Sequence, residues 1–395
     1  MATHAPSRLW SFRLLIVAAL ALLAVIYYTP IWWVALTAPN YPKEAFPEGV
    51  RIHFHLNGVF NGCHKVKGRE IQEEEVLDCV HEMDTINHYV GMYPIAAGGV
   101  IEKAVSQFLV VFLAVMLAGF LCVRPRVRVA ILGVGFAAVA AWMGLAWYGK
   151  GGIRFENKGY LEGLVHALTT DVEKESAEEQ ISSGMAVIEA LKKSLAESGV
   201  KVEGYEPTPS PGKLETKDDL IQYLKDSFEA DQARKPPSRR KAWTGSVRQV
   251  MAWHYEKTLG RYFNNPAEIR PMVRRMTTAG DVVYWAVVVA MVVLVVGNLV
   301  GARIFYWLLA FVPVLLPVFF VIEYSAWLWW YGHRLNKMGA FTVKPFMPTV
   351  FGDGKVAQFT THSYPYYGFG LMLVFSGLLI AAMLVRRRIL EEGGR

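Results

Sequence analysis

Long apolar runs without charges alternate with polar segments along the whole chain. A helix needs about 20 apolar residues to cross the hydrocarbon core of a bilayer, where every backbone amide must be paired inside the segment. Six runs reach this length, and they cover 14–38, 104–123, 129–148, 282–300, 304–330 and 366–385. The pattern predicts a mainly α fold, a polytopic membrane helix bundle of about six spans.

Arginine clusters mark one side of this bundle. They lie at the N-terminus, in both short loops between paired spans and after the last span: Arg8, Arg13, Arg124, Arg126, Arg128, Arg303, Arg386, Arg387 and Arg388. Positive residues concentrate in cytoplasmic loops. We therefore expect a multi-pass protein of the bacterial cytoplasmic (inner) membrane with both termini in the cytoplasm.

The net charge of +7 does not change this picture. About half of it lies in the arginine clusters, and no nucleic-acid-binding motif is present. Membrane lipids, not nucleic acid, are the expected partners. The chain also lacks an acyl-transfer triad, a phosphate-binding glycine loop and a His-Glu-x-x-His helix, which disfavours an enzyme of the soluble type.

The predicted topology divides the chain into seven segments. They are the N-terminal tail and first span (1–38), a periplasmic segment rich in His, Cys and Met (39–103), a hairpin of two spans (104–148), a mainly helical periplasmic segment (149–280), a second hairpin of spans (281–330), a periplasmic capping loop (331–365), and the last span with a cytoplasmic tail (366–395).

Local patterns predict elements inside the outer segments. Residues 50–57 alternate strictly between apolar and polar, which indicates a half-buried strand and gives the first segment a small β component. The second segment has helical patterns near 160–197, 215–230 and 243–263. The last of these is aromatic and basic, and suits either a membrane surface or packing on the first outer segment.

The first outer segment holds a cluster of soft and borderline metal ligands: His53, His55, His64, His81, Met83, His88 and Met92. His53 and His55 lie two apart, on one face of the predicted strand. His88 and Met92 lie four apart, so a helix would place both on one face beside Asn87. Histidine and thioether ligands together favour copper, particularly Cu(I). Between 43 and 84 acids outnumber bases nine to five, a balance that attracts cations.

The cysteines leave several alternatives open. In an oxidising compartment Cys63 and Cys79 form either a disulfide or free thiols more readily than a metal site. Cys122, inside a span, is expected to be a small buried apolar residue. Haem is a weaker alternative to copper, because Phe60 stands where a covalent haem site needs its first cysteine. A haem or quinone near His88, His333 and His362 remains an alternative.

Glu323 lies within the fifth predicted span, after Pro313 and Pro317, which should loosen the helix. An ionisable side chain at membrane depth is costly and indicates a functional site. This supports a second hypothesis, a transporter or channel with Glu323 on the pathway. The structural alternative is that Glu323 pairs with a neighbouring span or extends to the interface.

Two motifs together suggest a family. They are Ile86-Asn-His-Tyr-Val-Gly-Met92, and Gly332-His333 followed by Lys344-Pro-Phe-Met-Pro348 and Phe359-Thr-Thr-His-Ser-Tyr-Pro365. In these motifs, in the spans and in the first and third outer segments, the chain resembles a poorly characterised family of bacterial multi-span membrane proteins. Genes of that family lie near maturation genes for periplasmic copper proteins such as nitrous oxide reductase. The resemblance singles out Asn87, His88, Gly91, Met92, His333, Pro345, Phe346, Pro348 and Pro365.

The leading hypothesis is an integral membrane accessory protein that binds copper at its periplasmic face during assembly or maturation of a copper enzyme. Its expected partners are that periplasmic or membrane copper enzyme or its maturation factors. The expected metal ligands are His88, Met92, His53, His55, His64, His81, Met83, His333 and His362. The alternatives are a transporter or channel that uses Glu323, and an electron-transfer subunit with haem or quinone.

Overall fold

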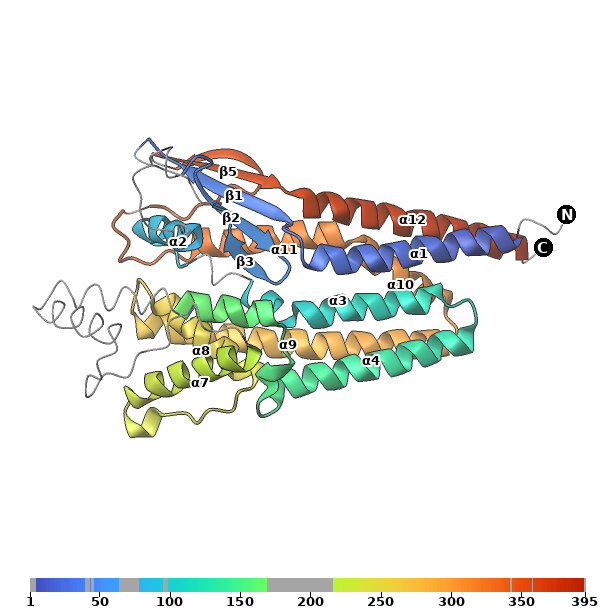
Figure 1. The fold of residues 1–395 in the computed structure, drawn as a ribbon, viewed down its shortest axis with the longest axis horizontal. Helices are drawn as coiled ribbons and strands as arrows, with labels where there is room; N and C mark the ends of the chain where they lie inside the picture. The colour runs from blue at the N-terminus through green and yellow to red at the C-terminus, as the bar shows by residue number, and fades with distance from the viewer. Residues whose placement is uncertain are drawn as a thin grey trace, which may run out of the picture.

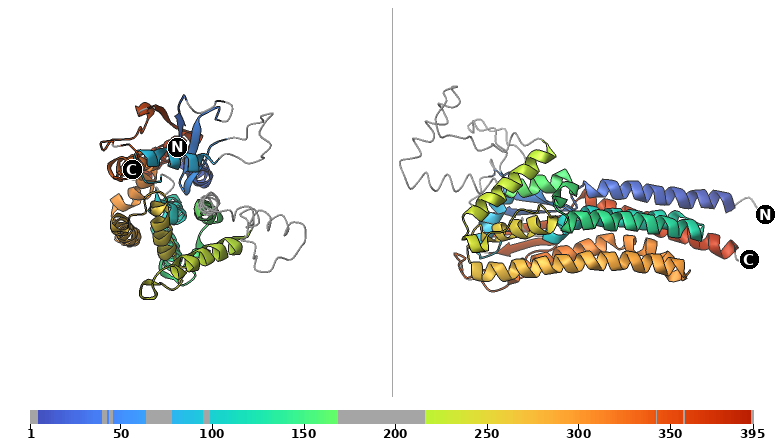
Figure 2. Two further views of the ribbon diagram at one scale, coloured as in Figure 1. Left: turned by 90° about the vertical axis from the view of Figure 1, so that its left-hand side faces the viewer. Right: turned by 90° about the horizontal axis from the view of Figure 1, so that it is seen from below.

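The computed structural model describes residues 5–39, 43, 46–63, 78–94, 99–168, 216–341, 343–356 and 358–393. Within these residues the chain is mainly helical, with one small antiparallel sheet. The long helices run side by side, and both termini lie at one end of the bundle (Figures 1 and 2). We call this the terminal end. The head region is the name we give to the sheet together with α2 (Cys79–Tyr89), α7 (Lys217–Ala233), α8 (Val247–Gly260) and the helix at 158–168.

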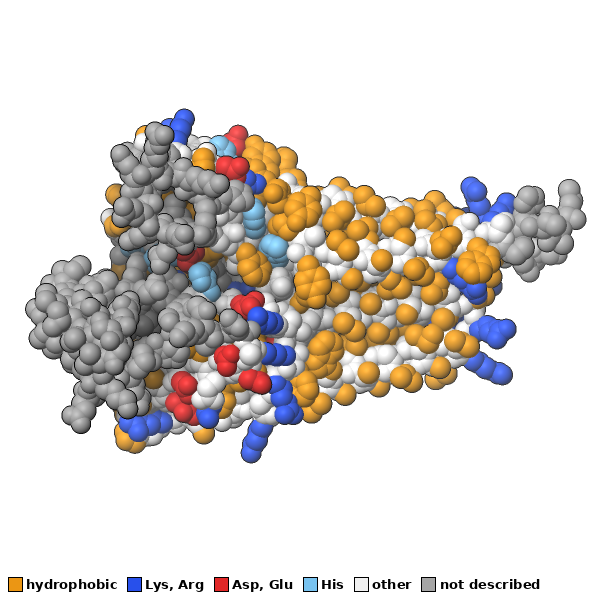
Figure 3. Space-filling model, in the orientation of Figure 1, with side chains coloured by type: hydrophobic (Ala, Val, Ile, Leu, Met, Phe, Trp, Pro, Cys, Tyr) orange, Lys and Arg blue, Asp and Glu red, His pale blue; other side chains and the backbone are white. Residues whose placement is uncertain are grey.

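Among the described residues, five helices are long and apolar enough to cross a membrane: α1 (Ala5–Tyr27), α3 (Val100–Leu121), α4 (Pro125–Tyr148), α9 (Pro266–Leu299) and α12 (Tyr367–Gly393). The pair α10 (Arg303–Val314) and α11 (Leu316–His333), which meet at an angle of 57°, is apolar and long enough to count as a sixth if it is taken as one bent span. Apolar side chains cover the shafts of these helices, while charged side chains gather over the head region and at the terminal end (Figure 3). The predicted mainly helical fold is confirmed, with five apolar helices of spanning length and the bent pair as the candidate for the sixth predicted span.

The bend between α10 and α11 follows from the two prolines. Pro313 and Pro317 lack the amide hydrogen that a continuous helix needs, and the break falls between them at Leu315. Ser376 of α12 donates a hydrogen bond to the Val314 carbonyl at 2.8 Å, beside the break. The loosening expected from the prolines is therefore a true change of direction.

The predicted first span is wrong at its end. It was expected to reach residue 38, but α1 ends at Tyr27 and β1 (Trp32–Thr37) follows after Pro30. β1 is the central strand of the sheet, so an apolar run without alternation suits it as well as a helix. The pattern of residues 32–37 alone could not separate these two outcomes.

The sheet joins distant parts of the chain in the order β3-β2-β1-β5-β4. β2 (Val50–His55) and β3 (Gly58–Asn61) form the hairpin that contains the predicted strand, with Val50 and Ile52 fully buried. β4 (Gly352–Val356) and β5 (Phe359–Pro365) come from the predicted capping loop. That loop is therefore ordered, and it is ordered as strands.

The two ends of the chain lie together along their whole length. α1 continues into β1 and β5 continues into α12, and β1 pairs with β5 in antiparallel register, with Val34 opposite Ser363. The helices pack side by side (Figure 1). At the terminal end Arg8 forms an ion pair with Glu392.

The second predicted outer segment is folded against the bundle. α7 (Lys217–Ala233) and α8 (Val247–Gly260) correspond to two of its predicted helices, and short 3-10 turns lie at Gly152–Phe155 and Pro237–Arg239. Of the predicted helix at 160–197, the structure describes the residues up to 168, which are helical. α9 starts at Pro266, well before the predicted span boundary at 281, because the amphipathic residues that precede the apolar run continue the same helix.

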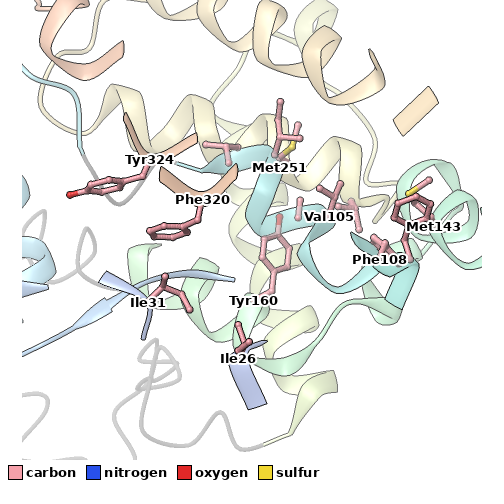
Figure 4. Close-up of a cluster of buried hydrophobic side chains, with 14 of the residues drawn as sticks. Ile26, Ile31, Val105, Phe108, Met143, Tyr160, Met251, Phe320 and Tyr324 are labelled. Atoms are coloured by element: carbon pink, nitrogen blue, oxygen red, sulfur yellow. The ribbon is translucent and has the colours of Figure 1, made fainter. Parts of the chain in front are cut away.

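The core is continuous from the bundle into the head region. Figure 4 shows side chains of α3, α8 and α11 in one buried cluster, including Val105, Met251 and Phe320. α8 packs on α3 and α9, and Tyr262, just after it, contacts Thr85 of α2 through the two hydroxyl oxygens at 3.2 Å. Of the two roles expected for this helix, packing is the one seen.

A disulfide joins Cys63, after β3, to Cys79 at the start of α2 (Cys79–Tyr89). Asp78 caps this helix by accepting hydrogen bonds from the amides of Val80 and His81 at 3.1 Å. The disulfide is one of the alternatives that the sequence left open. Cys122 is a free, half-buried cysteine after α3.

Candidate functional site

A cavity of about 210 Å³ lies between α3, α11 and the β2–β3 hairpin. Its deeper wall, away from the head region, is apolar and consists of Leu109, Val110, Leu113, Leu316, Phe319 and Phe320. Near the head region it is lined by Glu102, Lys103, Ser106, His55, Glu323 and Tyr331. The cavity is therefore amphipathic, apolar toward the middle of the bundle and ionisable at one end.

Helical spacing brings the lining residues onto one face of each helix. On α3 the residues Glu102, Ser106, Leu109 and Leu113 recur every three or four positions. On α11 the same spacing connects Leu316, Phe320, Glu323 and Trp327. These faces of α3 and α11 line the same cavity.

The two carboxylates converge on Gly99, at the start of α3. A Cβ atom placed on Gly99 would lie 3.9 Å from Glu102 Oε2 and 4.0 Å from Glu323 Oε1. The Trp327 side chain hydrogen-bonds to both carboxyl groups. Glu102 Oε2 is buried and has no hydrogen-bond partner among the described residues. A buried oxygen of this kind is an unused acceptor.

The surroundings contain more acid than base. Lys103 interacts electrostatically with Glu102 and with the fully buried Asp84 of α2. Three carboxyl groups, those of Asp84, Glu102 and Glu323, interact electrostatically with Tyr331, and Lys103 interacts with the first two of them. The Tyr331 hydroxyl, also buried, has no hydrogen-bond partner within the described part of the chain. Excess negative charge away from water is stabilised by a proton, a cation or further hydrogen-bond donors.

His55 contributes a neutral ring to the polar end of the cavity. Burial, with a smaller contribution from the charge of His53, lowers the pKa of His55 to about 4. At neutral pH it therefore carries no positive charge that could balance the carboxylates. Its ring packs edge-on against Phe60, with ring centroids 4.8 Å apart.

The predicted metal ligands are spread over the head region, each with its own protein contacts. His53 stacks on Tyr366 and His333 on Trp329, with ring centroids 5.1 and 4.6 Å apart. His81 Nε2 lies 3.5 Å from Thr85 Oγ1. Met83 is buried in the core.

His362 has two polar partners. Its Nδ1 pairs with Asp353 at 2.7 Å, and its Nε2 lies 3.1 Å from Thr37 Oγ1. His64 falls outside the described residues. Within the described ranges no three His, Cys, Asp or Glu side chains are grouped so that they could hold one metal ion.

The expectation that His88 and Met92 share a helix face is wrong. α2 ends at Tyr89, and Gly91 takes a left-handed backbone with φ of 83°. His88 donates through Nδ1 to the Thr85 carbonyl and stacks on Tyr262 at 4.6 Å. Met92 lies beyond the turn and is buried. A glycine in the motif ends the helix because its backbone takes this conformation without steric cost.

The motifs that carry the family resemblance meet in space through their backbones. The Gly91 carbonyl accepts a hydrogen bond from the Asn336 amide at 2.8 Å, and the Tyr89 carbonyl accepts one from Phe341 at 2.9 Å. A Cβ on Gly91 would lie 2.4 Å from the Asn336 carbonyl oxygen. The turn after Asn87 and His88 therefore holds the loop that follows α11.

Sequence reasoning identified Glu323 but missed its partner. Glu102 and Lys103 directly precede the predicted span 104–123, where charged residues are common, so their position in the sequence does not distinguish them. The only signal in the sequence was the Glu102, Ser106 spacing, which many solvated helix starts share. What makes these residues a site is the tertiary contact with α11.

The chain has no detectable relative among the proteins with which it was compared. No model of a known family matches it, and neither a curated protein nor a solved structure is significantly similar.

Proposed function

We propose that this chain binds an amphiphilic molecule from the membrane, in the manner of a transporter or carrier, with Glu102 and Glu323 as its recognition groups. The observation that supports this is a cavity between membrane helices with an apolar deeper wall and a polar end, at which the carboxyl groups of Glu102 and Glu323 outnumber the one lysine, Lys103. If the apolar tail of the ligand packs along Leu109 and Leu113, its polar head group lies at the carboxylates.

The hydrogen-bond acceptors at the polar end of the cavity define the chemistry of the ligand's head group. Two carboxylates and an unused buried oxygen favour a positively charged amine or a group with several donor hydrogens. An anionic head, such as a carboxylate or phosphate, would be repelled. A cavity of about 210 Å³ is small beside typical ligand pockets of roughly 300–1,000 Å³, which suits a single chain better than a large ring system.

Matched probes test this proposal. We expect dodecylamine to bind the purified protein in nanodiscs at least tenfold more tightly than dodecanoate, measured by equilibrium dialysis. Glu323→Gln, which keeps the shape of the side chain, should weaken dodecylamine binding about tenfold, since a charged hydrogen bond contributes about 1.5–3 kcal/mol.

Glu391→Gln is the matched control, because Glu391 is exposed near the terminal end and pairs with Arg387. It should bind dodecylamine like the unmodified protein. Equal binding of dodecylamine and dodecanoate, or full binding by Glu323→Gln, would contradict the proposal.

Copper binding during the maturation of a copper enzyme stays a prediction of the His- and Met-rich segment. Its support is the composition of residues 39–103 and the family resemblance. Metal analysis of the protein purified from its native membrane is the direct measurement. Loss of stoichiometric Cu(I) in His88→Ala or Met92→Ala would support copper binding, and unchanged retention in both variants would argue against those two ligands.

A further inference from the structure

The terminal end of the bundle contains two buried arginines around one tyrosine. Arg386 of α12 donates through Nε to the Tyr306 hydroxyl at 2.9 Å, and Tyr306 of α10 donates to the Phe120 carbonyl at 3.2 Å. The Arg128 guanidinium, from the first turns of α4, lies 4.5 Å from the centroid of the same tyrosine ring. Three helices thus place two positive charges on one aromatic side chain.

Both arginines are removed from water. Arg128 is 9% exposed and Arg386 is 5% exposed. Arg128 Nε is buried and has no hydrogen-bond partner among the described residues. Stacking on Tyr306 stabilises each cation to some extent, but it does not use this donor.

No acidic side chain is left to neutralise them. In the sequence of α1, α4, α10, α12 and the loops that join spans at this end, Glu391 and Glu392 are the only acids, against nine arginines. Glu391 pairs with Arg387 and Glu392 pairs with Arg8. Among the described residues, neither Arg128 nor Arg386 therefore has an anionic partner. Buried charges are stable when they are paired.

We infer that Arg128 and Arg386 form a binding site for a phosphate group at the terminal end of the bundle. Guanidinium groups match phosphate geometry and donate to it in pairs. Basic pockets between membrane helices take the head groups of anionic lipids. The apolar surface of the helix shafts borders the arginine-rich terminal end of the bundle (Figure 3), so a lipid phosphate bound at this end would have acyl chains beside it. A free phosphate ion presents the same chemistry.

The experiment compares lipids and phosphate on the full chain. Delipidated protein in detergent is titrated with phosphatidylglycerol, with phosphatidylcholine of the same acyl chains, and with inorganic phosphate, and the thermal unfolding temperature is followed. We expect phosphatidylglycerol to stabilise the protein more than phosphatidylcholine does. A comparable shift with inorganic phosphate would support the site and identify the free ion as sufficient.

Two variants locate the effect. Arg128→Gln keeps the Arg386–Tyr306 hydrogen bond, so this variant should fold. Its affinity for the phosphate-containing ligand should be about tenfold lower than that of the unmodified protein. Arg388→Gln removes an exposed arginine from the same end and changes the net charge equally. It should respond like the unmodified protein.

Two results would overturn the inference. One is an equal response of the unmodified protein to phosphatidylglycerol and phosphatidylcholine together with no response to phosphate. The other is the same loss of response in Arg388→Gln as in Arg128→Gln, which would indicate attraction by net charge alone. Phosphorus analysis of the purified protein gives a second readout, with less bound phospholipid expected for Arg128→Gln.

Discussion

The two ends of the helix bundle gather ionisable side chains of opposite type. Near the head region, the carboxyl groups of Asp84, Glu102 and Glu323 outnumber one lysine, Lys103, at the polar end of the cavity. At the terminal end, Arg128 and Arg386 surround Tyr306 with no acid between them. Each arrangement is unfavourable for the protein alone, and each becomes favourable with a ligand of the opposite charge.

The difference between the ends lies in how the charge is enclosed. Glu102 and Glu323 line a cavity with room for a molecule, whereas the arginines pack against an aromatic ring at the border of the apolar surface. The first geometry suits a ligand that enters between helices. The second suits a head group that approaches along the membrane surface.

Lowering the pH should produce the largest difference in stability between the two ends. Burial, aided by the charge of Lys103, lowers the pKa of His254 to about 3, and its Nε2 contacts the Leu164 carbonyl at 3.0 Å. Unfolded histidine titrates near pH 6.5, so between pH 6.5 and 3 the unfolded chain binds a proton that the folded chain does not. Stability should therefore fall as the pH decreases through this window, by up to about 4 kcal/mol.

Hydrogen exchange measures this effect by region. Between pH 7 and pH 4.5, after correction for intrinsic rates, α8 and the helix at 158–168 should lose protection, while α4 and α12 near the arginines should keep theirs. His254→Gln, which retains a donor for the Leu164 carbonyl, should remove much of the difference in protection between pH 7 and pH 4.5. Equal loss of protection at both ends of the bundle would contradict this prediction.

Removing one charge from the carboxyl cluster or from the arginine cluster should change the free energy of unfolding less than acid does. The change should differ between the two ends. In ligand-free protein, Glu323→Gln should raise the free energy of unfolding by about 1 kcal/mol, because it relieves repulsion from Glu102 and keeps an acceptor for Trp327. Arg128→Gln should change it less, since the relief is offset by the lost stacking on Tyr306.

Thermal unfolding without added amphiphile or phospholipid tests whether Glu323→Gln stabilises the protein more than Arg128→Gln does. Glu391→Gln serves as the control at an exposed position. A fall in stability for Glu323→Gln would indicate that Glu323 is balanced by a positive charge after all, and would weaken the comparison.

Part of the candidate site could be predicted from the sequence. Glu323 was identified because a carboxylate in an apolar run after two prolines is unusual. Glu102 was not, because an acid in the first turn of a span is common and its environment depends on what packs against it. The predicted copper ligands illustrate the opposite case: His53, His81, His88 and Met92 are close in sequence, but β2, α2 and the turn at Gly91 direct their side chains to different neighbours.

The sequence by itself determined the apolar helices, the arginine-rich end and the strand at residues 50–55, since each depends on a local period or a local charge pattern. The tertiary structure alone decided that residues 32–37 form a strand, because both a buried strand and a span are continuously apolar and only the pairing with β2 and β5 distinguishes them. It also decided which charges are left without a partner. Charge balance inside a bundle depends on which helices are neighbours, and that is set by packing over the whole chain.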